Sequence, residues 1–315
     1  MGRDILEQTM SVGDMIGRAV RIYRLNLRSW VPILIWPTII CMVGRVLFQG
    51  ATAYIPVVEG KLPLQIGLGV AAFVGLAIWF LAKWVIIVRQ LAFVRIANGF
   101  SDSLTEALDY MKSRQWSVVG IFVVLSFIMS AVGGLWMLEL IASAMLYKRD
   151  TLLALVSTTG LGFGFIAGFL SISFIYYVTF VVLSGIACEK IGLTAMVSRG
   201  FKLAGKAVFR TLYLGTMVSI TVYFISIPLW LPPFVLIGLD ALRVGADLNL
   251  AEEIPIFWQV VSSAWEPLVE MIIWPISSLT FGFFYYDLRL RQEAVDVILH
   301  LDANSTEPVS EVRFS

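Results

Sequence analysis

The feature of this sequence that most constrains its fold is a set of six long apolar segments. A helix of about 20 apolar residues crosses the hydrocarbon core of a bilayer. Only 14% of the 315 residues are charged, whereas soluble domains carry about 25%. The sequence therefore predicts an all-α, polytopic membrane protein with a single membrane domain over residues 1–302 and a flexible tail at 303–315. We place the six spans at about residues 30–48, 64–88, 116–140, 156–183, 211–237 and 263–288.

Amphipathic segments at 11–30, 101–116 and 187–210 precede the first, third and fifth spans. Basic residues in the first and last of these recur every three or four positions, which predicts a basic stripe on a helix lying in the membrane surface. Anionic lipid attracts Lys and Arg near that surface. We therefore expect contacts with anionic lipid or a partner complex from Arg18, Arg21, Arg24, Arg28, Arg199, Lys202, Lys206 and Arg210.

The order of amphipathic helix, span and span occurs three times, which predicts three parallel units. Residues 15–22 and 196–203 also resemble each other position by position in residue type. The similarity is short, so common ancestry and convergence on a basic amphipathic helix both explain it.

The placement of Lys and Arg predicts the orientation. Seventeen of them fall on the side of the N-terminus, and only Lys61, Lys148, Arg149 and Arg243 fall on the other. Cytoplasmic loops carry the excess of Lys and Arg, so we expect both termini to be cytoplasmic.

Four ionisable residues, Arg45, Glu139, Glu266 and Glu270, lie within the predicted spans near their outer ends. Charges inside a membrane are costly and commonly face a cavity or a partner. One interpretation is a polar outer vestibule; the other is an Arg45–glutamate ion pair, or side chains that reach the interface. Lys83 is interpreted as reaching the interface in the same way.

Two further patterns concern helix packing. Glycines at four-residue spacing, Gly160, Gly164 and Gly168, permit close approach of another helix, either within the bundle or between protomers of a homo-oligomer. At the end of the last span, Asp287 and Arg291 are four residues apart in the favourable order, which predicts an ion pair; Arg289 and Glu293 are spaced likewise.

The chain has few residues suited to catalysis or metal binding. It contains two cysteines and one histidine, His300, and no phosphate-binding glycine loop, nucleophile elbow or metal-binding histidine pair is present. We expect no enzymatic activity, no cofactor and no metal. The net charge of +1 gives no general attraction to nucleic acid.

The segments GDMIGRAVRIYRLNL, IACEKIGLTAMVSRGFKLAGKAVFR and YYDLRLRQE resemble bacterial integral-membrane proteins related to the membrane domain of glycerophosphoryl diester phosphodiesterases. The resemblance covers nearly the whole chain and implies a six-span protein of the bacterial inner membrane. It does not imply phosphodiesterase activity, because in that family the activity resides in a separate soluble barrel domain.

These patterns lead to two hypotheses for the function. The first is a non-enzymatic scaffold or accessory subunit that contacts anionic lipid and a partner complex through its amphipathic helices. The alternative is a transporter for a small molecule or lipid with a polar outer vestibule, which requires a cavity reaching into the bundle.

Overall fold

The computed structural model describes residues 9–58, 60–147, 151–244 and 255–293, without the side chains of 139–140, 142–147, 151–161 and 241–244. The described residues are 92% helical and contain no strand, which confirms the all-α prediction. Six of the helices are long and apolar enough to cross a membrane. Their order is α1 (Val12–Leu25), α2 (Leu27–Tyr54), the 3-10 turn η2 (Pro56–Val58), α3 (Leu62–Ala97), α4 (Leu104–Ser113), α5 (Gln115–Tyr147), α6 (Thr151–Cys188), α7 (Leu193–Gly205), α8 (Val208–Val244) and α9 (Ile256–Glu293).

A short helix followed by two long ones occurs three times in this order, as α1–α2–α3, α4–α5–α6 and α7–α8–α9. Side chains at the start fix two of the short helices. The Ser11 hydroxyl accepts the backbone N–H of Asp14, and the Ser103 hydroxyl accepts that of Glu106. Such caps satisfy N–H groups that have no partner inside the helix.

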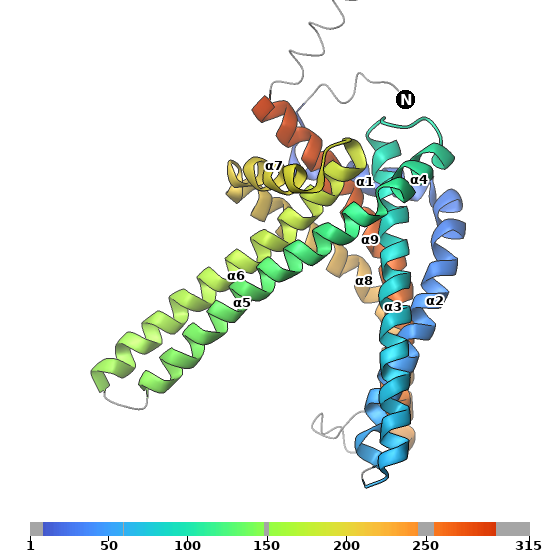
Figure 1. Cartoon of the computed structure of the whole chain (residues 1–315), viewed down its shortest axis with the longest axis vertical. Coiled ribbons are helices and arrows are strands. Elements are labelled where there is room, and N and C mark those ends of the chain that lie inside the picture. Colours follow the sequence, from blue (N-terminus) through green and yellow to red (C-terminus); the bar gives the residue numbers. More distant parts are fainter. Residues whose placement is uncertain (1–8, 59, 148–150, 245–254, 294–315) are drawn as a thin grey trace, which may run out of the picture.

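Each of the two basic amphipathic segments is broken, so the prediction of one continuous helix over either segment is wrong. Asn26 ends α1, with its backbone and side-chain N–H groups both donating to the Ile22 carbonyl, and Arg28 therefore belongs to α2. The weak helix former Gly205 ends α7, and Arg210 belongs to α8. Figure 1 shows α7 lying across one end of the molecule while α8 descends from it.

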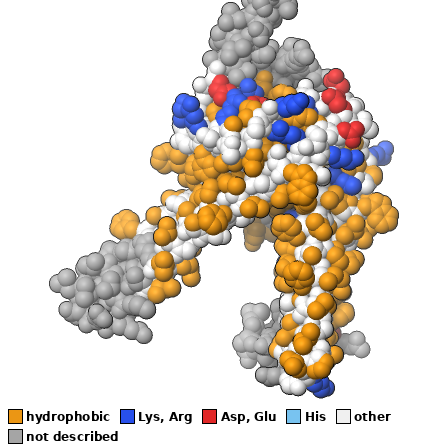
Figure 2. Space-filling model, in the orientation of Figure 1, with side chains coloured by type: hydrophobic (Ala, Val, Ile, Leu, Met, Phe, Trp, Pro, Cys, Tyr) orange, Lys and Arg blue, Asp and Glu red, His pale blue; other side chains and the backbone are white. Residues whose placement is uncertain are grey.

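Apart from α8, the long helices form two arms that separate with distance from this end (Figure 1). We call α2, α3 and α9 the column, and α5 with α6 the hairpin. The short helices α1, α4 and α7 gather where the two arms meet. Lys and Arg side chains cluster over them in Figure 2, whereas apolar side chains cover the described lengths of both arms. We call this end the basic end.

The core lies at the basic end and is built around α9. Within little more than one turn, this helix places Phe281, Phe283, Phe284 and Tyr285 in nearly complete burial. Farther out, α2 and α3 pack very closely through Gly44 and Gly75. A Cβ atom on Gly44 would lie 2.4 Å from the backbone nitrogen of Trp79, so only glycine permits this approach.

Candidate ligand-binding site

Two of the predicted lipid contacts, Arg199 and Arg210, are held in ion pairs within the protein. Arg199 pairs with Glu189, which follows α6, and with Glu293 at the end of α9. Burial lowers the pKa of Arg199, but the hydrogen bond to Glu293 and the surrounding negative charge outweigh that effect and raise it. Arg199 therefore stays charged and joins three elements.

Glu189 is the centre of this cluster. Besides Arg199, it binds Arg289 at 2.9 Å and accepts a hydrogen bond of 2.6 Å from the Tyr285 hydroxyl. Arg289 also pairs with Glu293, as predicted from their spacing.

Arg210 pairs with the carboxylate of Asp287, which is fully buried, at 2.8 Å. Asp287 also accepts the backbone N–H of Met10 at 2.9 Å and binds Arg291 at 3.0 Å. The predicted Asp287–Arg291 pair is thus confirmed and belongs to a larger cluster. It fastens the segment before α1 to α8 and α9.

On α7 the predicted basic residues do share a face, because Arg199, Lys202 and Lys206 line one groove, but this face borders α9 rather than pointing away from the bundle. The residues of α7 buried against the bundle are Met196, Gly200, Leu203 and Ala204. Arg199 is three positions from Met196 and four from Leu203, so it lies on the same face. The sequence pattern of α7 alone had placed Arg199 on the face that points away from the bundle.

The other predicted basic contacts lie at the basic end. Arg18 is half-buried over the Phe283 ring, 4.9 Å from its centroid, and burial lowers its pKa. The remaining five are exposed: Arg21, Arg24, Arg28, Lys202 and Lys206.

The charges within the spans form two ion pairs that join α9 to α2 and α3. Arg45 binds Glu266 at 2.8 Å, and Lys83 binds Glu270. The expected Arg45–glutamate pair is therefore present, whereas the interpretation that Lys83 reaches the interface is wrong. Lys83 also lies 4.2 Å from the centroid of the Trp274 ring, which stabilises its charge. The Glu139 side chain lies outside the described residues.

The predicted glycine series contributes to packing inside the chain. A Cβ atom on Gly168 would lie 2.3 Å from the Trp136 ring of α5, so this glycine serves the α5–α6 contact. Gly164 is buried, and the surroundings of Gly160 lie outside the described residues.

Glu266 and Glu270 also line a cavity of about 450 Å³ between α6, α8 and α9. We call it the glutamate cavity. Hydroxyl-bearing residues also line it, namely Tyr176, Tyr177, Ser219, Tyr223, Ser226 and Ser277. The carboxylates face this space from one side while their cations approach from α2 and α3.

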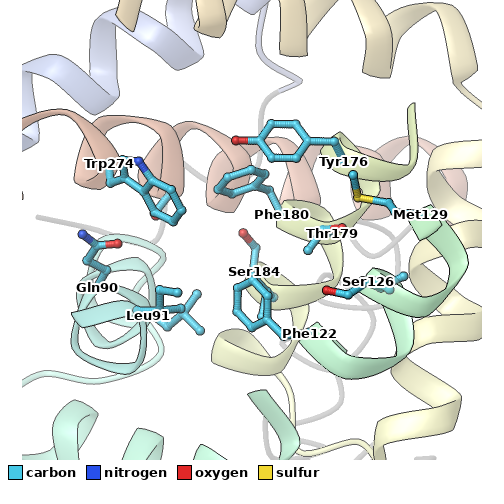
Figure 3. A pocket seen from close by; sticks show the side chains of 14 residues that line it. Gln90, Leu91, Phe122, Ser126, Met129, Tyr176, Thr179, Phe180, Ser184 and Trp274 are labelled. Atoms are coloured by element: carbon cyan, nitrogen blue, oxygen red, sulfur yellow. The ribbon is translucent and has the colours of Figure 1, made fainter. Parts of the chain in front are cut away.

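A second cavity of about 210 Å³ lies where the hairpin leaves the column, with walls from α3, α5, α6 and α9. We call it the Gln90 cavity. Figure 3 shows Gln90 and Trp274 on one side of this space, with Ser126 and Met129 across from them. It shares Tyr176, Phe180 and Trp274 with the glutamate cavity, so these three aromatic side chains are the partition between the two.

The inside of the Gln90 cavity is largely apolar, with a few uncharged polar side chains, and its mouth opens outward. Gln90, Thr179, Ser184 and Ser278 are buried and line it, and none of the residues described around it is charged. Ser126 and Tyr176 also line it but are exposed. The cavity is therefore accessible from the region between the arms.

Gln90 stands out among these residues. Its side chain is 2% exposed, and neither its amide nitrogen nor its amide oxygen has a hydrogen-bond partner in the described part of the chain. Buried amides are normally paired, and each exception calls for an explanation such as water or a ligand.

Sequence reasoning missed this residue because the second predicted span ended at residue 88 and only charged side chains were considered within the spans. A signal was present, since Gln90 lies just past that boundary in α3, between Arg89 and the apolar run 91–94. The described residues contain no group of His, Cys, Asp and Glu side chains able to hold a metal ion. Hydrogen bonding and apolar contact are the chemistry this site offers.

No family model, curated protein or solved structure matches the chain, and the resemblance to the phosphodiesterase membrane domain stays a prediction.

Proposed function

We propose that this protein is a non-enzymatic membrane protein that binds a lipid or similar amphiphile between its two arms and moves it between the bilayer and its cavities. The observation that carries the proposal is the Gln90 cavity, a largely apolar space with uncharged polar groups, which is built from both arms and opens between them. This corresponds to the transporter hypothesis, with the binding space placed at the junction of the arms rather than in an outer vestibule.

The two arms suit the apolar part of such a ligand. Large apolar side chains are exposed along both, including Phe73 of the column and Phe127 and Phe163 of the hairpin, each more than 70% exposed. In a bilayer, acyl chains cover such surfaces without the cost of exposure to water. A chain between the arms would place its polar end at the mouth of the cavity.

The charged side chains support a binding role rather than a chemical one. Glu266 and Glu270, the two carboxylates beside the cavities, are each neutralised by a cation. Both carboxylates therefore serve contacts within the protein, which join α9 to α2 and α3.

The proposed location is the inner membrane of a bacterium, with the basic end in the cytoplasm. Six long apolar helices make the chain a multi-pass membrane protein. The proposed orientation rests on the excess of Lys and Arg in cytoplasmic segments, and the bacterial membrane rests on the family resemblance.

Filling the mouth of the cavity tests the proposal. Ser126→Trp places an indole at an exposed position that lines the cavity. Val124→Trp is the matched control, two positions away on the opposite side of α5, where the side chain is 39% exposed and does not line the cavity. Both positions can accept the added bulk without a change in the core.

The readout is native mass spectrometry of protein purified in mild detergent. We expect a lipid-sized adduct on the unmodified protein and on Val124→Trp, reduced at least severalfold on Ser126→Trp. Equal adducts on both variants, or none on the unmodified protein, would contradict the proposal.

A scaffold or accessory subunit is the second candidate. It is favoured by the five basic side chains that stay exposed at the basic end, Arg21, Arg24, Arg28, Lys202 and Lys206. Each could contribute about 1 kcal/mol of attraction to an anionic leaflet, or contact another subunit.

A further inference from the structure

We infer that the Gln90 cavity receives an uncharged, hydrogen-bonding head group, such as the hydroxyls of a monoacylglycerol, and that the Gln90 amide binds it. This inference rests on the proposed function and narrows the class of its ligand.

The first step is the state of Gln90 itself. The side chain is 2% exposed, and both atoms of its amide are unpaired among the described residues. A primary amide has two donors and an acceptor with two lone pairs. Burying these groups unpaired is costly, and the apolar residues around them in α3, Ile87 and Leu91, offer no side-chain partner.

The second step is the shape of the space. Gln90 lines a cavity large enough for a polar group of several heavy atoms, and exposed residues form its mouth. Figure 3 shows Gln90 on one side of this space and Ser126 on the opposite side, with Ser184 between them in this view. A ligand entering from between the arms would therefore meet one amide and several hydroxyls.

The third step is the absence of charge around the cavity in the described structure. The cations nearest to Gln90 on α3, Arg89 and Arg95, do not line the cavity. Their guanidinium groups donate to the backbone carbonyls of Ile33 and Ala187. A phosphate placed there would be a buried charge without a counter-ion, which is strongly unfavourable. A hydroxyl, amide or ester group would instead donate to the Gln90 oxygen and accept from its nitrogen.

Two lipids that differ only by a phosphate provide the test. The probes are 1-oleoylglycerol and 1-oleoyl-lysophosphatidic acid, titrated against the full chain in mild detergent and followed by native mass spectrometry. We expect 1-oleoylglycerol to bind more tightly than the phosphate-bearing lipid by about tenfold or more, the equivalent of one hydrogen bond.

The variant Gln90→Leu tests the role of the amide. Because it removes an unpaired buried amide, we expect a thermal midpoint without lipid that is unchanged or higher, together with about tenfold weaker binding of 1-oleoylglycerol. Gln90→Met keeps the length of the side chain and serves as a second variant in case leucine leaves a void. It should weaken binding of 1-oleoylglycerol to the same extent. Gln49→Leu is the matched control, because Gln49 is half-buried on α2 and lines neither cavity.

The outcomes separate this inference from the proposed function. Binding of 1-oleoylglycerol that is unchanged in Gln90→Leu and Gln90→Met would overturn the inference, and would assign ordered water as the partner of the amide. Equal or tighter binding of the phosphate-bearing lipid would also overturn it while leaving lipid binding intact. Binding of neither probe, with no adduct on the purified protein, would overturn the proposed function as well.

Discussion

Replacing Asp287 by asparagine should destabilise the basic end more than any other single change of a carboxylate to an amide. Asp287 is completely buried, and its carboxylate accepts from Met10, Arg210 and Arg291. Asparagine has nearly the same volume but no charge, and only one of its two side-chain positions is an acceptor. The substitution therefore tests charge and hydrogen bonding with little change in packing.

The magnitude follows from the three partners. Hydrogen bonds to a charged group contribute about 1.5–3 kcal/mol each, and breaking a buried ion pair by removing one partner costs about 3–5 kcal/mol. The Arg210 side chain is 28% exposed and that of Arg291 is 38% exposed, so solvent reduces their share. We expect a loss of about 3 kcal/mol in the free energy of unfolding for Asp287→Asn.

The assay is reversible unfolding in mixed micelles by titration with sodium dodecyl sulfate, with hydrogen–deuterium exchange of α1 as a local readout. Asp109→Asn is the control, because its carboxylate is exposed and lies 3.6 Å from Lys112. Surface changes of this kind stay within about 0.5 kcal/mol. The same loss in both variants, or a loss in Asp287→Asn without faster exchange in α1, would refute the reasoning.

Two further predictions concern packing and the basic end. Gly44→Ala should cost about 3 kcal/mol in the same unfolding assay, because its Cβ would meet the backbone of Trp79, which cannot move aside. Gly67→Ala, with open space around it, should be neutral or slightly stabilising; equal effects would contradict the proposed close contact. If the basic end binds anionic lipid or a partner, a variant with the five exposed basic residues changed to glutamine should lose co-purifying anionic lipid or protein, whereas Lys112→Gln alone should not. Unchanged co-purification would remove the support for the scaffold candidate. The five residues are Arg21, Arg24, Arg28, Lys202 and Lys206.

Much of the fold was predictable because hydrophobicity along the chain is a local property. The apolar segments and the caps at Ser11 and Ser103 depend on residues near one another in sequence. The six long helices follow from length and composition alone, although each extends beyond its predicted span. The breaks at Asn26 and Gly205 were missed because the basic spacing continues across them.

The candidate site was less predictable because its contacts join distant parts of the chain. Arg210 lies 77 positions from Asp287, and Arg199 lies 94 positions from Glu293. A helical wheel shows Arg199 and Arg210 as parts of a solvated stripe, since it contains no information about those partners. The periodicity of the sequence predicted the spacing of the basic residues on α7, but not which face of the helix contacts the bundle.

Gln90 was not predicted from the sequence for a different reason. An amide beside Arg89 is an ordinary end for an apolar segment, and its role becomes visible only in the cavity that α3 forms with three other helices. The hairpin separates from the column with distance from the basic end (Figure 1), and this arrangement depends on contacts between helices that are distant in sequence. No single segment specifies it.

The most direct test of the proposed function is a map of the protein by electron cryo-microscopy in nanodiscs of native lipid. We predict elongated density between the column and the hairpin, ending in the Gln90 cavity within hydrogen-bonding distance of the amide. A hairpin packed along the column with the cavity closed, or a cavity holding only isolated water-sized peaks, would contradict it.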